Sequence, residues 1–92
     1  GGLSVVVATV DENAGQLVSG PDIVSRGFVY VRESEDLMEE VRRIAAAAIN
    51  SCIDRHGCDW YEIKNRIKDD ITRFLYTRTK RKPMILPIVM DV

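Results

Sequence analysis

A short stretch near the end of the chain concentrates positive charge and is the first candidate for contact with a ligand. Residues 73–82 contain no Asp or Glu, and their five basic residues are Arg73, Arg78, Lys80, Arg81 and Lys82. Such a cluster can contact the phosphates of RNA, with Tyr76 available to stack on a base. Alternatively, the cations gather because they stabilise the negative end of a helix dipole. The sequence is compatible with both interpretations.

Two cysteines and the single histidine form a second candidate, for metal binding. Cys52 and His56 are one helical turn apart, and Cys58 follows closely. A structural zinc site takes four ligands, usually with Cys-x-x-Cys spacing, and the nearby additions are Asp54 and Asp59. We therefore predict no metal site, with Cys52 in the core and His56 at a helix end. Because small secreted domains carry many disulfides, two cysteines favour a reducing, cytoplasmic setting.

Adjacent acids are the third candidate, for general acid–base catalysis. They occur at Glu35-Asp36, Glu39-Glu40 and Asp69-Asp70. Neighbouring residues of a helix point in different directions, so these pairs do not converge and instead predict a solvated helix face. One histidine is too few for His-paired hydrolases or multi-histidine metal centres. The sequence predicts no catalytic residue in this chain.

Composition indicates one small globular domain. The chain has 92 residues, a net charge of −1, 46% hydrophobic residues and 29% charged residues. A chain of this size forms a single core, so we predict one domain over residues 1–92. Its apolar runs are far shorter than the roughly 20 residues of a membrane-spanning helix, which predicts no membrane association.

Three stretches rich in β-branched residues predict strands. Residues 4–10 are nearly all apolar, as in a strand covered on both faces. After a polar turn, residues 16–32 return as a second strand with a bulge or bend at Gly20-Pro21. Residues 84–92 predict the last strand, and Pro87 places it at a sheet edge because proline lacks the N–H that a central strand needs.

Two helices are predicted between the second and third strands. The first has Ser34 as its N-cap, ahead of two acids, and runs from about Glu35 to His56. The second begins after the N-cap Asp59, and Pro83 ends the helical stretch. Apolar residues at helical spacing give each helix one buried face. The order is ββααβ, which predicts an α+β fold: a small three-stranded sheet with two helices packed on one face. The other face of the sheet then needs a partner, because the first and last strands are apolar at nearly every position.

Three segments of this chain resemble a known family. They are the motif GPDI-SRGF-Y-RE in residues 20–33, the segment DWYEIK in residues 59–64 and the motif TKR-PMILPI-M in residues 79–90. Together they resemble the C-terminal domain of the ribonuclease J family, over nearly the whole chain. The resemblance implies a small sheet with two helices that follows the catalytic core of a longer enzyme.

The resemblance also implies an activity for the parent enzyme. That enzyme has a metallo-β-lactamase core with an inserted β-CASP domain, and it cuts RNA as a 5′-to-3′ exonuclease and as an endonuclease at a pair of zinc ions. Its zinc ligands lie in HxHxDH-type motifs, which nothing in this chain matches, so the resemblance assigns no catalytic or metal residue here. The implied partners are the catalytic core, a second protomer, and RNA through the parent enzyme. Two roles remain for this chain: an assembly module, or an RNA-binding module that uses residues 73–82.

Overall fold

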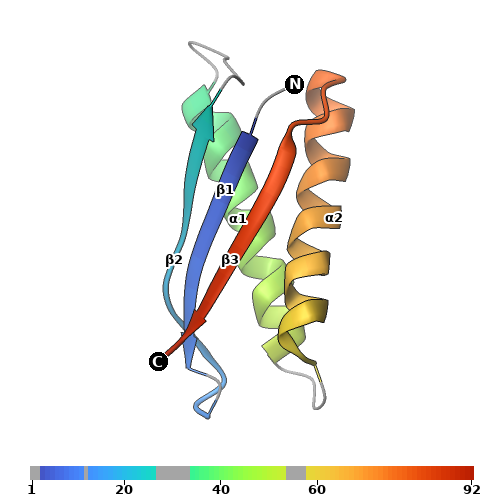
Figure 1. Ribbon diagram of the computed structural model, residues 1–92. Coiled ribbons are helices and arrows are strands. Elements are labelled where there is room, and N and C mark those ends of the chain that lie inside the picture. Colours follow the sequence, from blue (N-terminus) through green and yellow to red (C-terminus); the bar gives the residue numbers. More distant parts are fainter. Residues whose placement is uncertain (1–2, 12, 27–33, 54–57) are drawn as a thin grey trace.

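The computed structural model describes residues 3–11, 13–26, 34–53 and 58–92. Five elements follow one another in the predicted order ββααβ, which confirms the α+β fold (Figure 1). They are β1 (Leu3–Asp11), β2 (Gln16–Arg26), α1 (Ser34–Ile53), α2 (Trp60–Thr79) and β3 (Met84–Asp91). Three predicted features fall outside the described residues: the end of the second strand beyond residue 26, the helix end at His56, and His56 itself.

The strand order in the sheet is β2-β1-β3, so β1 is central. It pairs with β2 in the antiparallel direction and with β3 in the parallel direction. Pro87 lies opposite Val6 on an edge strand, which confirms the edge position predicted from its missing N–H. Both helices lie behind the same face of the sheet (Figure 1), with α1 packed against β2 and α2 against β3.

The second strand bends around two irregularities of the β1–β2 register. Val6 pairs with Ile23 and Val10 with Leu17, so β2 holds two more residues than β1 over this span. Because two is an even number, the alternation of side chains is preserved, and Leu17 and Ile23 both pack on the core. Gly20, with φ of 88°, lies within the bend and is joined to the buried Pro21 by a cis peptide bond. The predicted bulge at Gly20-Pro21 is confirmed.

The core lies between the sheet and the helices. Its largest fully buried side chains come from β1 and from both helices: Ile49, Ile67, Ile71, Leu75, Val6, Val10, Val41 and Cys52. Each large aliphatic side chain removed from water contributes about 1.5–3 kcal/mol. The predicted start of α2 is confirmed, because the carboxylate of the N-cap Asp59 accepts a hydrogen bond from the N–H of Glu62 at 2.8 Å.

The end of α2 differs slightly from the prediction. The helix ends at Thr79, before Pro83, because Lys80 adopts the left-handed conformation with φ of 60°. The Lys80 N–H donates to the carbonyl oxygen of Tyr76 at 2.8 Å, which satisfies one of the last carbonyls of the helix. This cap turns the chain toward β3. The basic residues that follow therefore lie at the same end of the molecule as the last turn of α2.

Candidate functional site

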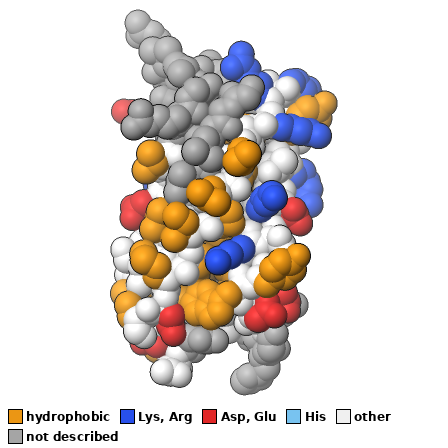
Figure 2. Space-filling view, viewed as in Figure 1, with side chains coloured by type: hydrophobic (Ala, Val, Ile, Leu, Met, Phe, Trp, Pro, Cys, Tyr) orange, Lys and Arg blue, Asp and Glu red, His pale blue; other side chains and the backbone are white. Residues whose placement is uncertain are grey.

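The sheet face opposite the helices is apolar and exposed. On β3 the side chains alternate: Ile85 is buried, whereas Met84, Leu86, Ile88 and Met90 are 39–68% exposed. Val24 of β2 lies on this same side, because its neighbour Ile23 packs on the core. We call these five exposed residues (Met84, Leu86, Ile88, Met90 and Val24) the open face. Figure 2 shows hydrophobic side chains gathered across it.

The predicted basic residues gather around two aromatic rings at the C-terminal end of α2. The ammonium groups of Lys80 and Lys82 lie 5.4 and 4.9 Å from the centroid of the Tyr76 ring. The guanidinium of Arg78 lies 5.2 Å from the centroid of the Phe74 ring. These are cation–π distances, so the aromatic rings help to hold the cations together. Tyr76, predicted to stack on a base, has its ring beside two ammonium groups.

The other two predicted basic residues have different surroundings. The Arg73 guanidinium donates to the Asp70 carboxylate at 3.4 Å, so part of its charge is balanced within α2. Arg81 is exposed, and its backbone N–H donates to the hydroxyl oxygen of Thr79 at 3.1 Å. Blue side chains at the upper right of Figure 2 mark basic residues near the end of α2. We call Arg78, Lys80, Arg81 and Lys82 the basic cluster.

A hollow of about 400 Å³ lies beside the basic cluster. Its lining residues come from the second half of α2 and from the turn that follows: Lys68, Asp69, Thr72, Arg73, Tyr76, Thr77 and Lys82. Three of them are basic and one is acidic, so the hollow carries net positive charge. Its floor is helix surface and its polar groups are exposed, which suits a loosely held anionic group better than a buried substrate.

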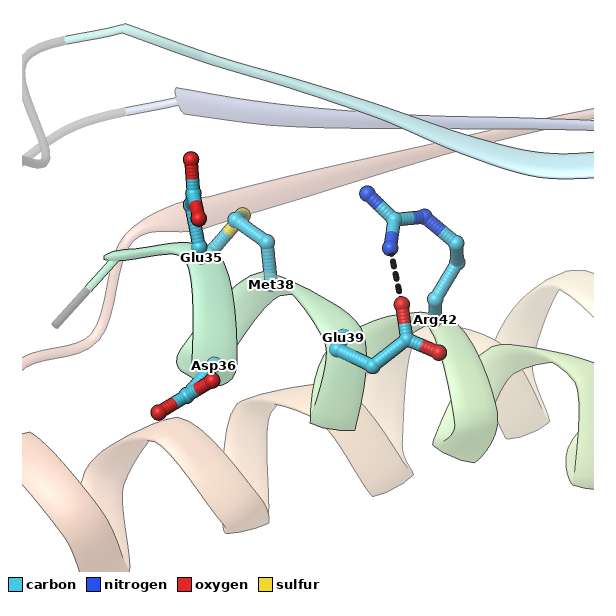
Figure 3. A pocket seen from close by; sticks show the side chains of 5 residues that line it. All are labelled: Glu35, Asp36, Met38, Glu39 and Arg42. Atoms are coloured by element: carbon cyan, nitrogen blue, oxygen red, sulfur yellow. Dashed lines mark hydrogen bonds and ion pairs between the residues drawn. The ribbon is translucent and has the colours of Figure 1, made fainter.

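The three pairs of adjacent acids lie on helix surfaces, and one pair, Glu39 and Glu40, shares the cation of Arg43. Figure 3 shows Glu35 and Asp36 pointing away from each other beside a hollow that they line with Met38, Glu39 and Arg42. Acids of the other pairs form ion pairs with arginines of their own helix: Glu39 with Arg42 and Arg43, Glu40 with Arg43, and Asp70 with Arg66 and Arg73. These exposed pairs at helical spacing are surface interactions worth a few tenths of a kcal/mol each.

The two cysteines are joined, which sequence reasoning did not predict. Cys52 and Cys58 form a disulfide with their Cα atoms 5.5 Å apart. Cys52 is 1% exposed, which confirms its predicted place in the core. A carboxylate oxygen of Glu62 lies within 4.8 Å of both sulfur atoms. The signal for this third residue is its spacing, because Glu62 follows Cys58 by one helical turn.

The donors in this chain do not fit the zinc pair implied by the family resemblance. With their sulfurs bonded to each other, Cys52 and Cys58 offer no thiolate ligand. Among the residues that the structure describes, the reduced cysteines and Glu62 would supply three donor groups, one fewer than a structural zinc site takes. A catalytic zinc pair needs several histidines, and the chain has one.

Within the part of the chain that the structure describes, no helix is both long and apolar enough to cross a bilayer.

These features define a class of protein: a small α+β domain with one sheet face covered by its helices and the other open. A comparison with known protein families identifies the family to which this domain belongs. The family model of the Ribonuclease J C-terminal domain matches residues 1–92, so the chain belongs to that family. The resemblance inferred from the three sequence segments is thereby confirmed.

Two relatives of this chain are much longer than the chain itself. It is 43% identical over 91 residues to Ribonuclease J2 of Bacillus subtilis (strain 168). It is 38% identical over 91 residues to Ribonuclease J 2 of Staphylococcus aureus (strain NCTC 8325 / PS 47). In both comparisons the match covers 99% of this chain but 16% of the relative.

Proposed function

We propose that this chain is the C-terminal accessory domain of an RNA-processing ribonuclease, and that its open face assembles the enzyme by pairing with a second protomer. The exposure of Met84, Leu86, Ile88 and Met90 on one side of β3 carries this proposal. Grouped apolar side chains on a single sheet face mark an interaction surface, because their exposure to water costs free energy that contact with a partner recovers.

The family membership supports a proposal for the whole enzyme. Its relatives are named ribonucleases, so we propose RNA as the substrate. In this proposal a metallo-β-lactamase core with a β-CASP domain and two zinc ions cuts the RNA, as a 5′-to-3′ exonuclease and as an endonuclease, in the cytoplasm. The present chain contacts that core and supplies no catalytic group. Its contribution is to dispose two catalytic cores correctly with respect to each other.

Sedimentation velocity over a range of concentrations tests the assembly role. We expect the 92-residue chain to self-associate, and the double variant Leu86→Lys with Ile88→Lys to sediment as a monomer, because two charges on the open face must be desolvated in an interface. The matched control is Tyr61→Lys with Thr77→Lys, which places the same charges at exposed positions of α2. We expect the control to associate as the parent chain does.

Two outcomes would refute assembly through this face. The first is a parent chain that stays monomeric at every concentration. The second is a double variant of Leu86 and Ile88 that still associates while its circular dichroism spectrum shows an intact fold. Loss of association in the control alone would instead place the interface on α2.

The basic cluster favours a second candidate function, RNA binding. Lys80 and Lys82 lie beside the Tyr76 ring and Arg78 lies beside the Phe74 ring, so three of the four cations of the cluster gather at the C-terminal end of α2. Cations held close together release counterions when they meet a phosphate backbone. The net charge of −1 weighs against this candidate, because dedicated nucleic-acid domains carry a basic excess.

Titration with single-stranded RNA at several salt concentrations tests the second candidate. If the basic cluster binds phosphates, affinity for RNA depends less steeply on salt in the triple variant Arg78→Ala, Arg81→Ala and Lys82→Ala. The negative slope of log affinity against log salt should become shallower by about 2. Lys80 is left in place because it is the C-cap of α2. The charge-matched control removes Arg42, Arg43 and Lys64, which lie elsewhere on the helices. Equal slopes in both triple variants would exclude the basic cluster as the RNA contact.

A further inference from the structure

The disulfide joins two sulfurs in very different surroundings. Cys52 is 1% exposed in the core, whereas Cys58 is half-buried at the start of α2. We propose that Cys58 is a thiol–disulfide exchange site for low-molecular-weight thiols and disulfides, and that Cys52 is the thiol that resolves the mixed disulfide. This inference concerns the helical hairpin and does not rest on the proposed assembly role.

Access selects Cys58 as the reacting sulfur. Exchange requires an attacking thiolate to approach one sulfur along the axis of the sulfur–sulfur bond. Cys52 lies among the fully buried side chains, together with Ile49 and Ile67, so an external thiolate does not reach it in the folded chain. Cys58 belongs to the partly buried residues at the margin of the core. The sulfur of the half-buried residue is therefore the one that a small thiol attacks.

The two helices act in opposite directions on the two thiols. Cys52 lies in the last turn of α1, where the negative end of the helix dipole disfavours a thiolate. Cys58 directly precedes Asp59, the N-cap of α2, where the positive end of the dipole favours a thiolate. After reduction, Cys58 is consequently the sulfur that reacts faster with an external disulfide, whereas burial lowers the thiolate fraction of Cys52. The same pair therefore contains one reacting and one resolving cysteine.

Glu62 restrains this reactivity. One of its carboxylate oxygens lies within 4.8 Å of both sulfurs, and a negative charge at that distance opposes formation of a thiolate. Its backbone N–H donates to Asp59, which holds the residue in the first turn of α2. Replacing Glu62 by glutamine keeps the shape of the side chain and removes the charge. The variant is therefore expected to undergo exchange faster than the parent chain.

The reaction balances with a small thiol as the only co-reactant. A thiolate of glutathione attacks Sγ of Cys58, the bond between Cys52 and Cys58 breaks, and Cys52 leaves with the electron pair and takes a proton. A second glutathione thiolate attacks the glutathione sulfur of the mixed disulfide and releases Cys58. The sum is two glutathione thiols and one protein disulfide converted into one glutathione disulfide and two protein thiols. The reverse sequence closes the bridge.

Single-cysteine variants test the assignment of the two roles. Reduced Cys52→Ala and reduced Cys58→Ala are each mixed with oxidised glutathione, and intact mass measures the added glutathionyl group over time. We expect Cys58 in the first variant to react at least about tenfold faster than Cys52 in the second. Circular dichroism verifies the fold, and Cys52→Ser serves as a second variant if Cys52→Ala does not fold. Equal rates, or a faster Cys52, would overturn the assignment.

Two further measurements separate exchange from a merely structural bridge. In buffers of reduced and oxidised glutathione, the parent chain is expected to change between dithiol and disulfide without accumulating the mixed disulfide, because Cys52 resolves it. Accumulation of the mixed disulfide, or absence of the bridge in every buffer, contradicts the proposal. Reduced Glu62→Gln should react with oxidised glutathione about two- to tenfold faster. The control Asp69→Asn, two turns further along α2, should react at the parental rate, and equal rates in both variants refute the role of Glu62.

Discussion

Replacement of Gly20 by alanine tests the bend of β2 that shapes one edge of the sheet. Gly20 has φ of 88°, and an added Cβ would lie 2.6 Å from the carbonyl oxygen of Val7 on β1. A positive φ costs an L-residue about 1–2 kcal/mol. The backbone contact adds roughly 1–3 kcal/mol of overpacking. The free energy of unfolding should fall by about 2–5 kcal/mol in total, out of roughly 5–14 kcal/mol expected for a domain of this size.

Gly15 provides the matched control. Its φ is 66°, but an added Cβ would meet Cγ2 of Ile53 at 3.5 Å, an ordinary van der Waals contact. Gly15→Ala therefore carries only the conformational cost of about 1–2 kcal/mol. Urea unfolding followed by circular dichroism measures both variants, with an unchanged dependence on denaturant expected. If Gly20→Ala costs no more than Gly15→Ala, the close approach of Gly20 to Val7 is refuted as the reason for glycine at this position.

Three further substitutions test the core, a helix cap and the surface charges. Ile71 is 0% exposed, and Ile71→Ala leaves a cavity in the core. In urea titrations the free energy of unfolding should fall by about 2–5 kcal/mol, and a smaller loss would show that the core closes around the cavity. Asp59→Ala removes the N-cap of α2 and should cost about 1 kcal/mol, a fall in Tm of about 4–8 °C by differential scanning calorimetry. Asp70→Asn removes exposed ion pairs with Arg66 and Arg73. It should lower the free energy of unfolding by at most about 1 kcal/mol, and by less at high salt. A loss that does not change with salt would contradict an electrostatic origin.

The helices were predictable because their signals are local. The N-cap Asp59 and the apolar residues Ile63, Ile67, Ile71 and Leu75 lie within one helix, so their spacing alone defines its start and its buried face. The edge position of β3 was predictable for a similar reason, since Pro87 lacks a hydrogen-bond donor wherever the strand lies. The basic cluster was also visible as a run of charges, although its contacts with aromatic rings were not.

Features that depend on distant contacts required the tertiary structure. The sequence predicted an uncovered apolar sheet face, but the strand order and the side chains of β3 that lie on that face, Met84, Leu86, Ile88 and Met90, came from the structure. The parallel pairing of β1 with β3 joins residues about eighty positions apart in the chain, which no local pattern encodes.

The disulfide shows the same division between local and tertiary information. The pattern of apolar residues placed Cys52 in the core, and the cap at Asp59 placed Cys58 just before α2. Their sulfurs meet between the end of α1 and the start of α2, with Glu62 beside them, and neither periodicity nor capping encodes that contact. Periodicity and capping are properties of neighbouring residues and can be read along the chain. The bond between the cysteines, and the residues that make up the open face, depend on how the chain is arranged in space.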